Sequence, residues 1–305
     1  MDFCILLDCH FNDLKLGETS AKTAQKKVLS LVNDYEDGKW RYSKFQDFIW
    51  DNIAETSLSQ RERESLGEKP SSLLRAAARN LRLTDKEGDI GRGSELAEIV
   101  LYGIMKHQFA ALPVVPKIFY KQNSQDNAKG ADSVHIVVND DDFSIWFGEA
   151  KFYTSIEDAR LASIISSVEN SLQTAKLKKE NSIITNVCDL DDLCLDPGLT
   201  QRIKNALSNQ QSIDGLKPKL NIPILLLHEC AITNAATVFS DEYRAQILEF
   251  HQQRAMSYIR KQIEQLSEKI HLYAEIKFHI ILFPVPQKAP IVDKFVSRVE
   301  FLRDE

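Results

Sequence analysis

The segment "SIWFGEAKFY", residues 144 to 153, places an acid and a base two positions apart in an otherwise apolar run. Its composition is that of a buried β-strand, in which side chains at positions i and i+2 project from the same face. Glu149 and Lys151 therefore share one environment. A carboxylate beside an ammonium group can help to hold a metal ion and to orient water, which is the chemistry of a hydrolytic centre.

A second acid is predicted to face Glu149 across a hairpin. The sequence "VVNDDDFS" joins two strands, and Asp140 with Asp141 is a suitable pair for a tight turn. Counting outward from this turn in an antiparallel ladder places Asp132 directly opposite Glu149. Two facing carboxylates, with Cβ atoms about 4.5–5.5 Å apart, destabilise a sheet unless something offsets their repulsion.

A divalent cation would offset this repulsion. Mg²⁺ is expected, with Mn²⁺ as a possible substitute, because it takes carboxylate oxygens and keeps several waters for substrate phosphate. Lys151, one pleat beyond Glu149, could orient a metal-bound water and stabilise charge developing on phosphorus. We expect Asp132, Glu149 and Lys151 to converge at a solvent-accessible site.

The helix ahead of the hairpin carries two more carboxylates, Glu95 and Glu98, on one face. The apolar neighbours of Glu98 place it nearer the buried boundary, so Glu98 is preferred as a further metal ligand, with Glu95 as the alternative. The candidate catalytic residues are therefore Asp132, Glu149, Lys151 and Glu98, and the candidate metal ligands are the three acids among them.

An acid-x-Lys triplet is weak evidence by itself, because the chain contains four of them. The ordinary explanation for Glu149 and Lys151 is an exposed ion pair, worth ~0–1 kcal/mol. This triplet is distinguished by its strand context and by the acid expected across the hairpin.

The surrounding elements are predicted in the order α-β-β-β-α-β-α-β, which describes a mixed sheet flanked by helices in an α/β fold. Helices are expected at 93–109, 155–179 and 241–271, and strands at 114–122, 131–139, 143–153, 222–229 and 276–285. Residues 1–84 read as a mainly helical N-terminal subdomain, with helices at 20–35, 43–56 and 71–83. Residues 85–305 form the second domain, with an insertion around 186–220.

The charge, the cysteines and the amino terminus indicate where the protein works and whether it binds nucleic acid by itself. The net charge of −6 is unfavourable for a protein that must hold nucleic acid alone, so a cation or a partner would have to assist. The five cysteines are scattered without metal-ligand spacing, and the amino terminus has no apolar run long enough for export. A cytoplasmic protein without membrane contact is expected.

The arrangement of Asp132, then Glu149-x-Lys151 on the next strand, resembles the PD-(D/E)xK nuclease superfamily, with its α-β-β-β-α-β core. Ala131 stands where the motif has proline. More narrowly, "GRGSELAEIVLY", "GADSVHIV" and "IWFGEAKFYTSI" resemble the HamA family, the nuclease subunit of the Hachiman anti-phage defence system, over roughly residues 85 to 285.

The resemblance implies that Asp132 and Glu149 bind Mg²⁺ and that Lys151 assists the water that cuts a DNA phosphodiester bond. It also implies a partner, the superfamily 2 helicase HamB, which engages DNA and restrains the nuclease until invasion or DNA damage is sensed. Two alternatives stay open: a catalytically silent scaffold that uses the nuclease fold to dock a partner, and a stand-alone restriction endonuclease.

Overall fold

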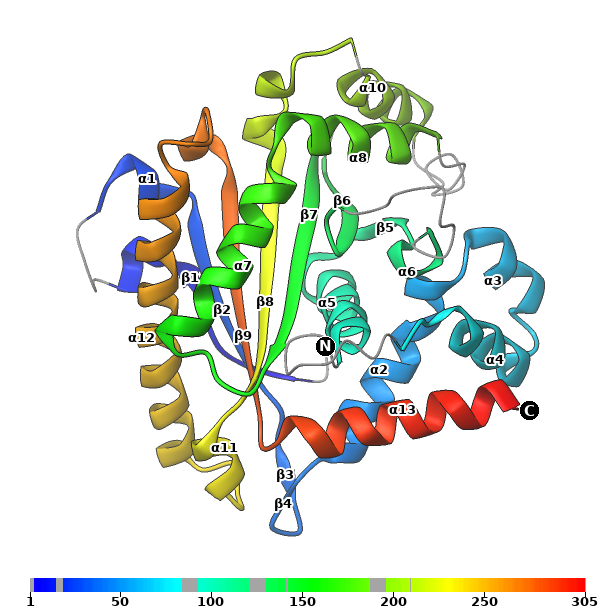
Figure 1. Cartoon of the computed structure of the whole chain (residues 1–305), viewed down its shortest axis with the longest axis vertical. Helices are drawn as coiled ribbons and strands as arrows, with labels where there is room; N and C mark the ends of the chain where they lie inside the picture. The colour runs from blue at the N-terminus through cyan, green and yellow to red at the C-terminus, as the bar shows by residue number, and fades with distance from the viewer. Residues whose placement is uncertain are drawn as a thin grey trace.

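A seven-stranded mixed sheet forms the centre of the molecule, in the strand order β1-β2-β9-β8-β7-β6-β5 (Figure 1). The computed structural model describes residues 3–14, 19–83, 93–120, 130–140, 142–186, 196–208 and 210–304. The strands are β1 (Cys4–His10), β2 (Lys26–Val32), β5 (Leu112–Val115), β6 (Ser133–Asn139), β7 (Asp142–Tyr153), β8 (Leu220–Glu229) and β9 (Lys277–Val285), with a separate small hairpin of β3 (Tyr35–Glu36) and β4 (Lys39–Trp40). The mixed α/β sheet predicted from the sequence is confirmed.

The middle of the sheet is parallel and its edges are antiparallel. β2, β9, β8 and β7 run in one direction, while β1 pairs antiparallel with β2 at one edge, and β6 and β5 form an antiparallel meander at the other. β8 and β9 are buried along almost their whole length. Their nearly continuous apolar sequences are typical of parallel strands covered on both faces.

Helices cover both faces of the sheet (Figure 1). One face packs against α7 (Asp158–Ser171), α8 (Thr174–Asn186), α10 (Pro197–Leu207) and α12 (Asp241–Leu266). The other packs against α2 (Tyr42–Ser57), α4 (Pro70–Asn80), α5 (Ser94–Phe109) and α13 (Lys288–Asp304). Shorter helices connect these elements: α1 (Ala21–Ala24), α3 (Gln60–Leu66), α6 (Lys117–Tyr120), α11 (Ala231–Ala235), η1 (Phe11–Leu14), η2 (Ile213–Gly215), η3 (Lys217–Lys219) and η4 (Tyr273–Glu275).

The alternation of β7 assigns its side chains to these two layers. Ile145 and Phe147 belong to the core beneath α7 and α12, whereas Trp146 and Phe152 belong to the core beneath α2, α5 and α13. Glu149 follows the odd-numbered side, so its carboxylate belongs to the α7 layer.

Three predicted elements differ from the structure. The helix expected at 20–35 is wrong beyond the short α1: β2 occupies Lys26–Val32, because its apolar side chains are buried by parallel pairing with β9. The strand expected at 114–122 is also wrong from Pro116 to Tyr120, because Pro116 lacks the N–H that a ladder needs and α6 begins directly after it; residues 121 and 122 lie outside the described residues. The helix expected at 155–179 is divided into α7 and α8.

The N-terminal part of the chain does not stand apart from the sheet, since it contributes β1 and β2. The predicted boundary between residues 84 and 85 lies outside the described residues and stays a prediction. Within the predicted insertion, α10, η2 and η3 precede β8, while residues 187–195 and 209 are not described. α13 has no counterpart in the sequence-based prediction.

Candidate active site

The hairpin register places Asp132 beside Glu149. β6 and β7 pair with Ser133 opposite Gly148, and the same ladder continues to the turn. One step beyond Ser133, the backbone N–H of Asp132 donates to the carbonyl of Gly148 at 2.8 Å, and Asp132 Oδ2 accepts from the N–H of Ala150 at 3.1 Å. The predicted register is confirmed, and Asp132 is held in place by backbone hydrogen bonds on both sides of Glu149.

Lys151 joins the two carboxylates. Its Nζ atom lies 3.5 Å from Oδ2 of Asp132 and 3.9 Å from Oε2 of Glu149. Burial by itself would lower the pKa of Lys151, but the carboxylates of Asp132 and Glu149 raise it above its usual value. The ammonium form is therefore stabilised, and it offsets the repulsion between the facing acids.

The three side chains differ in exposure. The Lys151 side chain is 20% exposed and that of Asp132 is 15% exposed, but that of Glu149 is only 2% exposed. The expected exposure is therefore found for two of the three and not for Glu149. The reason is α7, which packs over this part of β7 and whose Ser167 donates from Oγ to Oε2 of Glu149 at 2.8 Å. Solvent reaches this cluster past Asp132 and Lys151.

The two acids of α5 have different surroundings. Both carboxylate oxygens of Glu95 accept backbone N–H groups, from Arg82 and Leu83, at 2.8 Å each. Glu98 is buried at 6% exposure, and its charge is among those that raise the pKa of Lys151. Glu95 thus holds the backbone that follows α4 in place. Glu98 is the acid of the two whose charge acts on Lys151.

Gly148 allows α5 and β7 to lie close together. A Cβ atom at this position would be 2.2 Å from Oγ of Ser133 and 2.7 Å from Cδ2 of Leu101 on α5. Both approaches are too short for a side chain. The glycine immediately before Glu149 therefore fixes how close the hairpin partner and α5 come to the candidate site.

The donor set suits a hard cation with few protein ligands. Among the described residues, no three His, Cys, Asp or Glu side chains are grouped as a metal cluster. Mg²⁺ is usually bound through only one or two carboxylates, together with waters and substrate phosphates. Asp132 and Glu149 supply two facing carboxylates, so they fit this mode of binding.

Sequence reasoning missed Ser167. It lies in α7 at helical spacing from the buried residues Ile164 and Ser171, so its polar side chain borders the buried stripe of this helix. That position was a usable signal that the side chain has a buried partner, but only the packing of α7 on β7 identifies Glu149 as that partner.

Comparison with models of known protein families shows to which family the chain belongs. The model of the HamA family matches residues 8–299, which is nearly the whole chain. The chain belongs to the HamA family. HamA-family membership makes the protein a component of the Hachiman anti-phage defence system. No curated protein matches the sequence. In the described part of this HamA-family protein, none of the helices combines the length and the apolar character required to cross a membrane.

Proposed function

We propose that this HamA-family protein is a Mg²⁺-dependent DNA endonuclease of the PD-(D/E)xK type and the effector subunit of its defence system. One observation carries the proposal: the Nζ atom of Lys151 lies within 4 Å of carboxylate oxygens from both Asp132 and Glu149. Paired acids with an adjacent lysine, presented by neighbouring strands, are suited to hydrolysing a phosphodiester bond.

Asp132 and Glu149 are the residues proposed to hold Mg²⁺, and Glu98 contributes the charge by which it raises the pKa of Lys151. A bound Mg²⁺ would supply Lewis acidity toward the phosphate and would lower the pKa of a coordinated water. The backbone hydrogen bonds to Asp132 and the Ser167 hydrogen bond to Glu149 orient the two carboxylates before any ligand arrives. Such fixed orientation is what an outer layer of partners contributes to a metal site.

Lys151 is proposed to act on the water and on the phosphate. Its ammonium form is favoured at neutral pH, because the neighbouring acids raise its pKa. In that form it can donate a hydrogen bond that orients the attacking water, and it can stabilise negative charge that develops on the phosphate oxygens.

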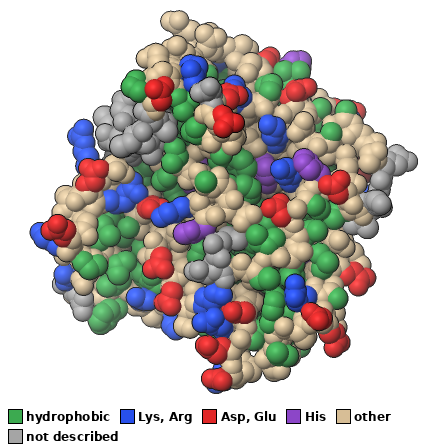
Figure 2. Space-filling view, turned by 180° about the vertical axis from the view of Figure 1, so that it is seen from behind, with side chains coloured by type: hydrophobic (Ala, Val, Ile, Leu, Met, Phe, Trp, Pro, Cys, Tyr) green, Lys and Arg blue, Asp and Glu red, His purple; other side chains and the backbone are tan. Residues whose placement is uncertain are grey.

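A helicase partner is part of the proposal, namely a superfamily 2 subunit of the HamB type that delivers DNA. The net charge of −6 supports a nuclease that does not gather DNA unaided. Figure 2 shows acidic and basic side chains interspersed over one face, without a continuous basic area. Sequence-independent DNA binding normally uses several lysines and arginines that neutralise phosphates together.

The test is a cutting assay with the helicase partner, ATP, DNA and either Mg²⁺ or EDTA. Wild-type protein should nick or degrade DNA with Mg²⁺ and be inactive with EDTA, and Glu149→Ala should be inactive in both. Glu275→Ala is the matched control, because Glu275 is an exposed acid in another Glu-x-Lys triplet. Defined bands in place of a smear would assign sequence-specific cutting.

A catalytically silent scaffold is the second candidate. It is favoured by the 2% exposure of the Glu149 side chain and by the ion pairs that engage Lys151. A scaffold would keep phage protection in Glu149→Ala cells at normal protein levels. Loss of protection in those cells, with helicase binding intact, would reject the scaffold and favour the nuclease.

A further inference from the structure

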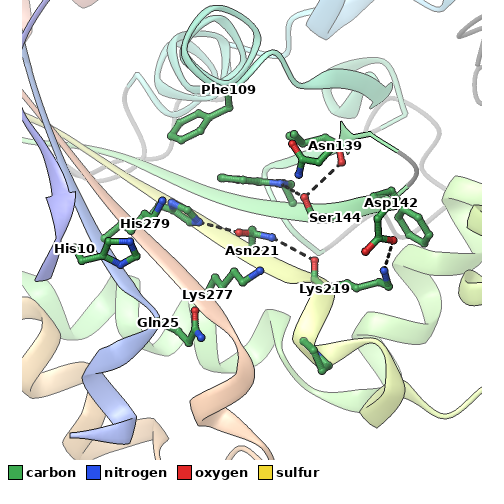
Figure 3. A pocket seen from close by; sticks show the side chains of 15 residues that line it. His10, Gln25, Phe109, Asn139, Asp142, Ser144, Lys219, Asn221, Lys277 and His279 are labelled. Atoms are coloured by element: carbon green, nitrogen blue, oxygen red, sulfur yellow. Dashed lines mark hydrogen bonds and ion pairs between the residues drawn. The ribbon is translucent and has the colours of Figure 1, made fainter. Parts of the chain in front are cut away.

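A cavity of about 410 Å³ lies at the end of the sheet where β2, β8 and β9 begin (Figure 3). It is lined by the first residues of β2, β8 and β9, by the β6–β7 hairpin and by Phe109 at the end of α5. Trp146 of β7 lines it from the even-numbered face, whereas Glu149 projects from the odd-numbered face. The cavity and the candidate active site therefore lie on opposite faces of one strand.

The charges around this cavity are unbalanced. Three lysines line it, Lys27, Lys219 and Lys277, against one described acid, Asp142. Asp142 forms its ion pair with Lys219. Lys27 and Lys277 form no ion pair with any residue that the structure describes. Two lysines are thus left facing the cavity without a counter-ion from the described chain.

The two lysines come close through strand pairing. β2 and β9 are parallel neighbours, with Lys27 opposite His279, and Lys277 lies two residues before His279 on the same face. Burial and then the charges of Lys27, Lys277 and His10 lower the pKa of His279 to about 3. His279 is therefore neutral at physiological pH, and Lys27, Lys277 and His10, which contribute to this shift, all line the cavity. Lys27 and Lys277 are thus diagonal neighbours of like charge, and a bound anion would relieve their repulsion.

Neutral hydrogen-bonding groups are fixed beside the lysines. The Nε2–H of His279 donates to Oδ1 of Asn221 at 2.9 Å, since an amide oxygen can only accept. The amide nitrogen of Asn221 in turn donates to the backbone carbonyl of Lys219 at 3.2 Å. Figure 3 shows these residues along one side of the cavity, with Phe109 on the other. The polar side is held in place without a ligand.

The remaining wall is aromatic. The ring centroid of Trp146 lies 4.4 Å from that of His279 and 4.8 Å from that of Phe109. The indole Nε1–H of Trp146 donates to Oγ of Ser144 at 2.9 Å, which fixes the plane of the ring. An aromatic wall next to two lysines favours a ligand that has both an anionic end and an aromatic part.

We propose that this cavity binds a nucleoside phosphate, with the phosphate at Lys27 and Lys277 and the base against Trp146 and Phe109. The volume lies within the range of about 300–1,000 Å³ that is usual for small-molecule sites. The phosphate can belong to a free mononucleotide or to the 5′ end of a DNA strand. This site is separate from the acidic cluster, so the proposal goes beyond the proposed hydrolytic function.

The experiment is calorimetric titration of the full-length protein with dAMP in EDTA, where cutting is absent. Deoxyadenosine and inorganic phosphate are titrated separately, because each supplies one half of the ligand. Lys27→Gln and Lys277→Gln are compared with Lys294→Gln, a control at an exposed lysine on α13. Loss of one charge-assisted contact should weaken dAMP binding by about tenfold or more in either cavity variant, and the control should bind normally.

The source of the phosphate is distinguished by competition with a 5′-phosphorylated single-stranded oligonucleotide. Displacement of dAMP by this oligonucleotide but not by its unphosphorylated form assigns a strand end, and no displacement assigns a free nucleotide. Absence of dAMP binding to wild type, or unchanged binding in both Lys27→Gln and Lys277→Gln, overturns the proposal. Inorganic phosphate that binds as tightly as dAMP also overturns it, because the base then contributes nothing. Binding in a Glu149→Ala background separates this result from the nuclease test.

Discussion

Replacement of Lys151 by alanine should destabilise the protein and make its stability depend on divalent cations. The change removes the ammonium group that lies 3.5 Å from Asp132 and 3.9 Å from Glu149, and it leaves two facing carboxylates. Removing one partner from a fully buried ion pair costs about 3–5 kcal/mol. Because the Lys151 side chain is 20% exposed, solvent screening reduces this cost, and we expect about 2 kcal/mol.

The assay is thermal unfolding of wild type and Lys151→Ala in EDTA and in Mg²⁺. For a chain of 305 residues, a loss of about 2 kcal/mol corresponds to a decrease in Tm of about 3 °C. Mg²⁺ at about ten times its Kd should return about 1.4 kcal/mol to the variant, because the cation takes over the role of the missing ammonium group. Wild type retains the Lys151 ammonium group, so Mg²⁺ should increase its free energy of unfolding by less.

Lys39→Ala is the matched control, since Lys39 belongs to another acid-x-Lys triplet and is exposed in the β3–β4 hairpin. It should unfold like wild type in both buffers. A Lys151→Ala protein with an unchanged Tm in EDTA and no response to Mg²⁺ would refute the reasoning, because the two acids would then need no cation between them.

Three further results are expected. Gly148→Ala should lower the free energy of unfolding by about 1–3 kcal/mol in urea titrations, because its Cβ would be 2.2 Å from Oγ of Ser133; an unchanged midpoint would contradict the close packing. Ser167→Ala should raise the Mg²⁺ concentration for half-maximal cutting about tenfold, because Glu149 loses its hydrogen bond, and an unchanged Mg²⁺ titration would remove Ser167 from the site. Burial lowers the pKa of His135 from 6.5 to about 3. Below pH 6.5 the unfolded chain therefore binds a proton at this histidine that the folded chain does not bind, and the free energy of unfolding decreases as the pH is lowered. His135→Phe should therefore lose about 2 kcal/mol less than wild type between pH 7 and pH 5, and equal losses would contradict this.

The local part of the candidate site could be predicted from the sequence. A two-residue turn fixes the register of a hairpin, and alternation then fixes which side chains share a face. These two rules were sufficient to place Asp132 next to Glu149 and Lys151, and the pairing of β6 with β7 follows them.

The long-range part could not be predicted in the same way. The segment 20–35 has apolar residues at spacings that suit a helix, and only pairing with β9, from the other end of the chain, makes it a strand. The near-complete burial of Glu149 depends on α7 packing over β7. The cavity is built from strand ends between His10 and His279 and has no local signature.

The most direct test of the central claim is the cutting rate of the helicase-associated protein with Mg²⁺, measured for wild type, Lys151→Ala and Lys39→Ala at equal amounts of folded protein. If Lys151 acts on the water and the phosphate, its loss should slow DNA cutting by about 10²-fold or more, while Lys39→Ala cuts at the wild-type rate. A folded Lys151→Ala protein that cuts DNA as fast as wild type would contradict the account.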